Sequence, residues 1–148
     1  MKQLLILLFA AFCFTGYTAQ TADPVKWHAT YKSVSKTEGE IIISATIDKG
    51  WHTYSQRETD AGPIPTSFKF TPSKLYSLVG KTTESNAHEE YVKAFEAKIF
   101  VFHDKAEFIQ KVKLTGKASL ITFKVEYMCC NDMMCLPPKI LELSVKTQ

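Results

Sequence analysis

The chain has 148 residues, which leaves room for one domain and excludes a multidomain enzyme. Apolar residues make up 45% of it, aromatic residues 12% and charged residues 22%, so disorder, collagen and coiled coil are poor interpretations. The 18 Lys and Arg residues exceed the 15 Asp and Glu residues by only three charges, and the basic residues are scattered along the chain. A nucleic-acid-binding surface is therefore not expected, because such a surface needs clustered basic residues.

The first residues of the chain are typical of a signal peptide. Lys2 supplies a positive start, residues 4–14 form an apolar run, and small residues follow up to Ala19. An apolar run of about 11 residues is shorter than the ~20 residues needed to cross a bilayer. We therefore expect residues 1–19 to be a signal peptide of an exported protein and residues 20–148 to form a single domain.

The spacing of apolar residues after the expected signal peptide is typical of a β protein. From Val25 onward, apolar residues recur mainly with a period of two, which is typical of strands that have one face on a core. Residues 25–31 and 41–47 alternate in this way on either side of a turn, and together they predict a hairpin. Asp48-Lys49-Gly50 then turns the chain into a strand at 51–55.

The rest of the chain continues the same pattern. Pro63 and Pro65 indicate an irregular or edge segment before residues 67–71. Turns are expected at 103–105 and 115–117. Further strands are predicted at 75–80, 95–102, 107–114, 120–128 and 140–145, which gives roughly eight strands in all.

The fold class that this pattern predicts is all-β. No ten-residue segment carries an amphipathic helical stripe, and the chain holds no repeat or low-complexity tract. The best architecture is therefore an antiparallel β-sandwich of immunoglobulin type, with a closed barrel as the alternative. The disulfide that joins distant strands of antibody domains is missing, because the cysteines of the mature chain are bunched together.

Chemistry is expected in the connection between the last two predicted strands. Residues 127–138 read Tyr-Met-Cys-Cys-Asn-Asp-Met-Met-Cys-Leu-Pro-Pro and contain three of the four cysteines. Cysteines of exported proteins usually pair, and three of them leave one over. A bridge between Cys130 and Cys135 would close a loop so short that it stabilises the fold by only about 2 kcal/mol. A redox-active pair is therefore favoured over a structural staple, which remains the alternative.

Three further residues of this connection bear on its chemistry. Pro137 and Pro138 fix the backbone just past Cys135 and stiffen that end of the loop, or they simply end strand pairing. Asp132 lies within the loop, and its charge would raise the pKa of a neighbouring thiol. Its alternative role is that of an ordinary loop aspartate that accepts hydrogen bonds from backbone amides.

The cysteine segment resembles that of a known family. The run from Cys130 to Pro138, with Tyr127 three residues before it and a strand expected on each side, resembles the active-site hairpin of the N-terminal domain of the thiol:disulfide interchange protein DsbD. Residues 48–55 are similar to the turn and aromatic strand of that domain, and residues 89–93 to its acidic, aromatic cap loop. The resemblance covers essentially the whole mature chain, but only the cysteine hairpin is specific.

The resemblance implies a function. It implies a periplasmic, immunoglobulin-like monomer that takes electrons from a membrane-embedded thiol reductant and passes them to thioredoxin-like or disulfide isomerase proteins, including those of cytochrome c biogenesis. Such a thiol:disulfide oxidoreductase component needs no cofactor and no metal besides its cysteine pair. The resemblance implies Cys130 and Cys135 as that pair. Cys129 is an alternative thiol, because the spacing of the pair varies in the family, although the position of Tyr127 favours Cys130.

The resemblance also implies a cap over the cysteine pair. The family usually offers a phenylalanine at the tip of the cap loop, and here Tyr91 or Phe95 would take its place. Alternate residues of the strand at 51–55 share a face and would line the cap. The residues expected to shield the pair are Glu89, Glu90, Tyr91, His52 and Tyr54.

Two other functions compete with thiol exchange. A Cu(I)-binding module would use the soft sulfur ligands of the loop, which are Met128, Cys129, Cys130, Met133, Met134 and Cys135. Zinc is weaker, because the four histidines at 28, 52, 88 and 103 have no ligand spacing to the cysteines. The second competitor is a noncatalytic β-sandwich that binds protein or glycan and merely staples its hairpin.

Overall fold

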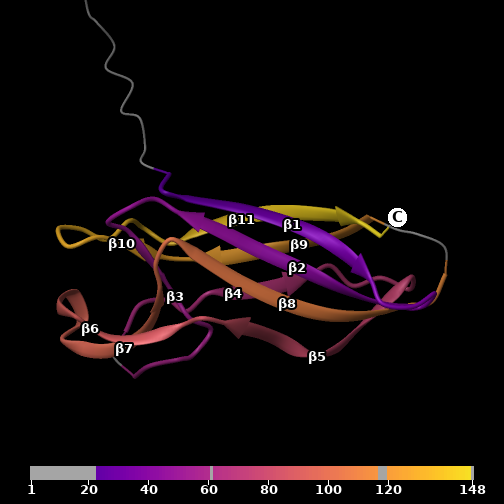
Figure 1. The fold of residues 1–148 in the computed structure, drawn as a ribbon, viewed down its shortest axis with the longest axis horizontal. Helices are drawn as coiled ribbons and strands as arrows, with labels where there is room; N and C mark the ends of the chain where they lie inside the picture. The colour runs from indigo at the N-terminus through magenta and orange to yellow at the C-terminus, as the bar shows by residue number, and fades with distance from the viewer. Residues whose placement is uncertain (1–22, 61, 117–119, 148) are drawn as a thin grey trace, which may run out of the picture.

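The computed structural model describes residues 23–60, 62–116 and 120–147, and the expected signal peptide lies outside them. These residues form eleven strands and one short 3-10 helix, η1, and none of their helices is long and apolar enough to cross a membrane (Figure 1). The strands are β1 Val25–Ser33, β2 Glu38–Ile47, β3 His52–Tyr54, β4 Ser67–Phe70, β5 Tyr76–Ser85, β6 His88–Val92, β7 Ala97–Phe102, β8 Lys105–Leu114, β9 Leu120–Tyr127, β10 Cys129–Cys130 and β11 Lys139–Lys146.

All strand pairs are antiparallel, and they form three sheets in the described chain. One sheet has the order β1-β2-β8-β5, and a second has the order β11-β9-β4. The third sheet, β10-β3-β7-β6, is made of short strands and lies at one end of the elongated molecule (Figure 1). The prediction of an all-β antiparallel sandwich is therefore confirmed, and the short-strand sheet is the part that places the cysteines.

Turns that the sequence predicts connect several of the strands. In the turn at 48–50, the amide of Trp51 donates to the carbonyl of Asp48 over 3.0 Å, and Gly50 has a φ of 82° that favours glycine. The hairpin between β1 and β2 closes where the amide of Val34 donates to the carbonyl of Glu38. The predicted turn at 115–117 reaches Lys117, which lies outside the described residues.

Two predicted elements were wrong in their bounds. The strand expected to end at Gly80 runs on to Ser85, because the register against β8 shifts between Val79 and Thr83 and Gly80 takes a φ of 70°. A bulge of this kind lets a strand continue past a glycine. The strand expected to begin at Phe95 begins at Ala97, since residues 93–95 form η1 and the acidic stretch before them is a strand, β6.

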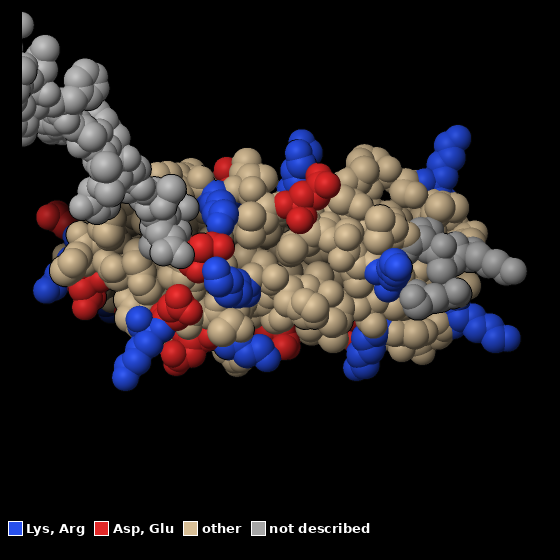
Figure 2. Space-filling model, turned by 90° about the horizontal axis from the view of Figure 1, so that it is seen from above, with Lys and Arg blue, Asp and Glu red and all other residues tan. Residues whose placement is uncertain are grey.

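Apolar side chains gather in two clusters. The main core lies between the two long-strand sheets and includes Ile41, Phe108 and Phe123, none of which is exposed. A second, smaller cluster lies under the short-strand sheet and consists of Tyr54, Val92, Ile99, Val101 and Cys130. On the face seen in Figure 2, acidic and basic side chains lie next to one another over the left and middle of the molecule, and the right end shows mainly basic side chains.

Candidate redox site

A disulfide joins Cys130 to Cys135 at the end of the short-strand sheet. Cys130 lies on β10, where it pairs with His52 of β3, and Cys135 forms an isolated antiparallel bridge with Cys130. The Cα atoms of the two cysteines are 4.0 Å apart, within the ~7 Å that a disulfide can span. The pair thus closes a tight hairpin loop at the sheet edge.

The adjacent cysteines Cys129 and Cys130 point to opposite faces of β10, as successive residues of a strand do. Cys130 is 1% exposed and belongs to the second cluster, whereas Cys129 is 4% exposed and belongs to the main core. Cys129 is a free thiol in this arrangement. Burial, with a smaller effect of the Asp23 charge, raises the pKa of its thiol to about 11, so it stays protonated and is a poor nucleophile.

The loop between the two cysteines is built by Asn131. Its side-chain Oδ1 accepts hydrogen bonds from the amides of Met133 and Met134 at 2.9 and 2.8 Å, and its own amide donates to the carbonyl of Met134. This is the side-chain turn that asparagine favours, and it had been one of the two roles considered for Asp132. Asp132 is an exposed residue of the same loop, and its charge tends to raise the pKa of His52.

The far end of the loop returns the chain to the sandwich. The amide of Leu136 donates to the carbonyl of Cys129 over 2.9 Å, which fixes the backbone immediately after Cys135. Pro137 and Pro138 are exposed and separate this hydrogen bond from the start of β11. Because proline has no backbone N–H, the two prolines cannot extend the pairing of β10 or of β11.

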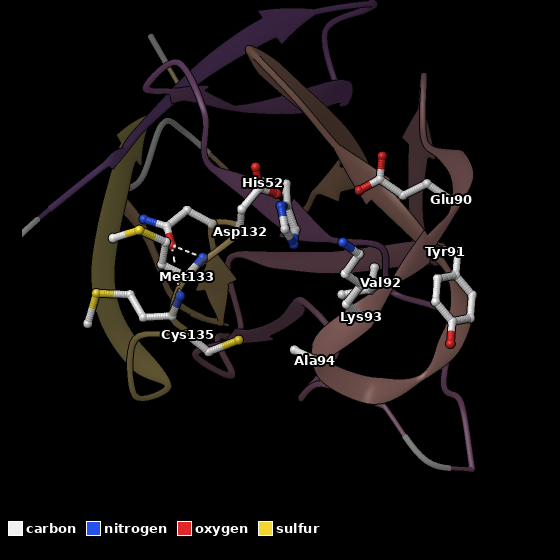
Figure 3. A pocket seen from close by; sticks show the side chains of 11 residues that line it. His52, Glu90, Tyr91, Val92, Lys93, Ala94, Asp132, Met133 and Cys135 are labelled. Carbon is white, nitrogen blue, oxygen red and sulfur yellow. Dashed lines mark hydrogen bonds between the residues drawn. The ribbon is translucent and has the colours of Figure 1, made fainter.

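The two cysteines of the disulfide differ in their exposure to solvent. Cys130 is buried, but Cys135 is half-buried and lines an open cavity of about 630 Å³ (Figure 3). The cavity lies between the cysteine loop on one side and the residues after β6 on the other, and His52 and Glu90 also line it. Met133 at the rim is 89% exposed. A reacting group from solvent can therefore approach Cys135 more readily than Cys130.

The expected cap residues of β6 fall on two faces. Because side chains alternate along a strand, Glu90 shares a face with the buried Val92, and Glu89 and Tyr91 lie on the other face. Tyr91 is 59% exposed, and in Figure 3 its ring points away from Cys135. Glu89 pairs with Lys98 at 3.8 Å. Of the three, Glu90 and Tyr91 line the cavity with Cys135, although the ring of Tyr91 points away from the disulfide (Figure 3).

The aromatic side chain that packs near the disulfide is Phe95 of η1. It lies against the second cluster, together with Cys135, and its ring meets the ring of Tyr54 edge-on at 6.0 Å. Of the two candidates for the tip of the cap, Phe95 packs on the cluster that contains Cys130, and Tyr91 lines the cavity beside Cys135. The short helix explains this, because it folds residues 93–95 back over the end of the sheet.

His52 and Tyr54 lie on the disulfide side of β3, as their spacing predicts. The Nε2 of His52 and the hydroxyl of Tyr54 share a hydrogen bond of 3.1 Å, and both side chains are buried. Burial lowers the pKa of His52, against opposing charges on Glu90 and Asp132, and burial raises the pKa of Tyr54 far above its usual value. Both groups are therefore held in their neutral forms beside Cys130.

Histidines far apart in the sequence come together next to this pair. The ring of His103 lies 5.5 Å from that of His52 and 5.2 Å from that of His88, measured between centroids. The Nε2 of His103 donates to Oε2 of Glu90 over 2.9 Å. A linear pattern does not predict this group, because only the pairing of strands brings together three histidines that lie 15 to 51 positions apart in the chain.

The sulfur ligands proposed for Cu(I) do not converge in the described structure. Cys129 faces the main core, Met128 packs on the second cluster, and Met133 projects into solvent. The sulfur atoms of Cys130 and Cys135 are already joined to each other. A copper site in this loop would therefore require the loop to rearrange.

The fold and the site together define a small β-sandwich with a solvent-reachable disulfide in an edge hairpin. Residues 20–145 match the family model described as thiol:disulfide interchange protein DsbD, N-terminal, and the chain belongs to this family. Its fold is the immunoglobulin-like antiparallel sandwich that the sequence predicts. In a search of curated proteins, no sequence matches the chain.

Solved structures agree with this assignment of the fold. The reduced N-terminal domain of DsbD from Neisseria meningitidis superposes with a TM-score of 0.55 at 19% identity, covering 78% of this chain and 82% of that one. The same domain in complex with the PilB N-terminal domain gives 0.54 at 16% identity, with 80% of each chain covered. The N-terminal periplasmic domain of ScsB from Proteus mirabilis gives 0.51 at 16% identity, covering 82% of this chain but only 44% of that one.

Proposed function

We propose that the protein exchanges thiols and disulfides with other proteins through a reversible Cys130–Cys135 bond. The observation that carries this proposal is the unequal access of the two cysteines. Cys135 faces an open cavity, whereas Cys130 is buried behind it. Exchange through a mixed disulfide needs one accessible sulfur and one protected sulfur that resolves the intermediate, and the hairpin offers both.

The reaction consists of two exchanges. In the reduced protein, the thiolate of Cys135 attacks a disulfide of the partner, forms a mixed disulfide and releases one partner thiolate. The thiol of Cys130 then loses its proton and attacks the Sγ of Cys135, which releases the second partner thiolate and forms the Cys130–Cys135 bond. The partner gains two electrons and, on protonation of its two thiolates, two protons. A dithiol reductant restores the protein by the reverse sequence.

The direction of electron flow that we propose rests on the likeness to the family. We place this chain between a membrane-embedded thiol reductant and thioredoxin-like or disulfide isomerase proteins in the periplasm, including those of cytochrome c biogenesis. The complex of a related DsbD domain with a PilB domain supports a protein as the partner, and the periplasmic origin of the related ScsB domain supports the compartment. Export of this chain rests on the expected signal peptide at residues 1–19.

The test is to trap the mixed disulfide. A Cys130→Ser variant keeps the accessible thiol of Cys135 but lacks the thiol that resolves the intermediate. Incubated with an oxidised thioredoxin-like protein, it should form a covalent 1:1 adduct that dithiothreitol releases. Mass spectrometry of the digested adduct should place the bridge at Cys135.

Two matched variants serve as controls. Cys135→Ser should form no adduct, because the remaining Cys130 is buried, and Cys129→Ser should exchange at the rate of the unmodified protein. Adduct formation through Cys129, or full exchange activity in both Cys130→Ser and Cys135→Ser, would refute the proposal and favour the stapled binding module.

A further inference from the structure

A second group of polar side chains lies beside the disulfide and takes no part in the exchange reaction. His88, Glu90 and His103 place one ligand atom each within 4.8 Å of the other two. Oε2 of Glu90 lies 2.9 Å from Nε2 of His103 and 3.6 Å from Nε2 of His88. Two imidazole nitrogens and one carboxylate oxygen therefore converge on a single point at the surface.

The sheet brings these residues together through its register. His88 and Glu90 are two residues apart on β6, so their side chains lie on the same face. His88 pairs with Val101 of β7, and His103 is the first residue after that strand, in the tight turn to β8. Backbone pairing thus holds His88 and Glu90, and the hydrogen bond to Glu90 holds the ring of His103 beside them.

The neighbours of the group hold its rings in place and leave it open. The rings of His88 and His103 stack with 28° between their planes. The ring of His52 packs on that of His103 with 56° between their planes. All three ligand side chains remain partly exposed to solvent. An ion from solution can therefore reach the group without opening the fold.

The donor set selects a borderline transition metal. Imidazole nitrogen with one carboxylate suits Zn²⁺ and its neighbours, whereas Mg²⁺ and Ca²⁺ prefer oxygen ligands alone. Ligands at about 2.0–2.1 Å from a tetrahedral Zn²⁺ lie roughly 3.4 Å from one another. The two separations from Glu90 fall on either side of this value, so small side-chain rotations would complete the geometry.

We propose that His88, Glu90 and His103 bind one Zn²⁺ ion, with water in the fourth position. The site is separate from the disulfide. Cys130 of β10 pairs with His52 of β3, and His103 directly follows β7, the strand on the other side of β3, so roughly two strand spacings of ~5 Å separate His103 from Cys130. The proposal does not depend on thiol exchange and would stand if the disulfide were only a staple.

The test is a titration of the oxidised, tag-free protein with ZnCl₂, followed by calorimetry. Oxidation joins Cys130 to Cys135, and Cys129 is buried, so no thiol among the described residues competes for the metal. We expect one Zn²⁺ per chain and no heat with MgCl₂. His88→Ala, His103→Ala and Glu90→Gln should each weaken binding more than tenfold, since even residues behind metal ligands contribute 10–100-fold.

The chain offers one histidine and one glutamate outside the proposed site as matched controls. His28 lies on β1, away from the short-strand sheet, and Glu89 lies on the opposite face of β6 from Glu90. His28→Ala and Glu89→Gln should bind Zn²⁺ as the unmodified protein does. Binding that survives His103→Ala unchanged, or that is lost equally in His28→Ala, would overturn the proposal.

A second measurement separates metal binding from a loss of folding in the variants. In nuclear magnetic resonance spectra of the oxidised protein, one equivalent of Zn²⁺ should shift the ring signals of His88 and His103 and leave those of His28 in place. The thermal midpoint should also rise with added Zn²⁺, because the ion binds the folded state. An absence of both effects at a large excess of ZnCl₂ would refute the site directly.

Discussion

The two apolar clusters of this protein differ in what they hold. The main core is filled mostly by aliphatic and aromatic side chains, and Phe108 packs there against the rings of Phe68 and Phe102. The second cluster is smaller and contains a tyrosine hydroxyl bonded to His52, and half of a disulfide whose other half reaches solvent. One β-sandwich can thus hold the side chains that stabilise its fold and those that react under different sheets. Cys129 and Cys130, adjacent in sequence, belong to one region each.

The largest effect expected is on exchange activity in the second region. Cys130→Ser or Cys135→Ser should abolish electron transfer to an oxidised thioredoxin-like protein, because each removes one of the two sulfur atoms of the reaction. Both variants should stay folded and lose only about 2 kcal/mol, since the loop that the bond closes is short. An Ellman-type thiol assay measures the loss of electron transfer, and far-ultraviolet circular dichroism measures whether the variants are folded.

The opposite pattern is expected in the main core. Phe108 is fully buried and packs against Trp27, Phe68 and Phe102, so Phe108→Ala should lower the free energy of unfolding by about 3–5 kcal/mol. The remaining folded molecules should exchange thiols at the normal rate. Urea denaturation of the oxidised protein measures the first effect. A large loss of exchange without a loss of stability would show that the two regions are coupled.

Cys129 tests the boundary between the regions. A pKa raised from 9.0 to about 11 lowers the thiolate fraction near pH 7 by about 100-fold, so iodoacetamide should label Cys129 of the folded protein far more slowly than after unfolding. Mass spectrometry of the oxidised protein, in which Cys129 is the free thiol of the described residues, measures this rate. Rapid labelling under native conditions would mean that β10 opens readily.

The same thiol predicts a dependence of stability on pH. Because the folded pKa lies above the unfolded one, burial of the neutral thiol stabilises the fold fully below pH 9, and this contribution is lost as the pH rises toward 11. The loss is on the order of 2–3 kcal/mol. Cys129→Ala should therefore show a shallower decline of the unfolding free energy between pH 9 and pH 11. An equal decline in both proteins would assign the effect to other groups.

Much of the fold could be predicted from the sequence. Period-two alternation identified the long strands, because each of them has one face on the main core, and the turn at Gly50 was marked by its residue types. The bulge at Gly80 was not predicted, since a glycine ends a strand as readily as it bends one. The acidic strand β6 was also missed, because it covers a small cluster and its alternation is weak.

The site was predictable only where its parts are close in the sequence. The shared face of His52 and Tyr54 follows from local spacing, whereas the choice of Cys130 over Cys129 as the partner of Cys135 came from the resemblance to the family. The position of Phe95 depends on η1, and that of His103 on a register between strands, and neither leaves a trace in a linear pattern. The segment of Tyr91 was expected to be a loop and is the strand β6, and Tyr91 lines the cavity beside Cys135 with its ring turned away from the disulfide.

The smallest effect expected concerns the cover of the disulfide. Phe95 packs with Cys135 on the second cluster, so Phe95→Ala should speed reduction of the bond by dithiothreitol, and about 1 kcal/mol of lost packing corresponds to roughly a fivefold change. Tyr91→Ala is the matched control, because the ring of Tyr91 points away from the disulfide and its loss should leave the rate unchanged. The reduction rate follows from quenched samples separated by mass after thiol labelling. If Tyr91→Ala were the faster variant, the cap would close by a motion of β6 that brings its outer face over Cys135, and the cover would not be the packed ring of η1.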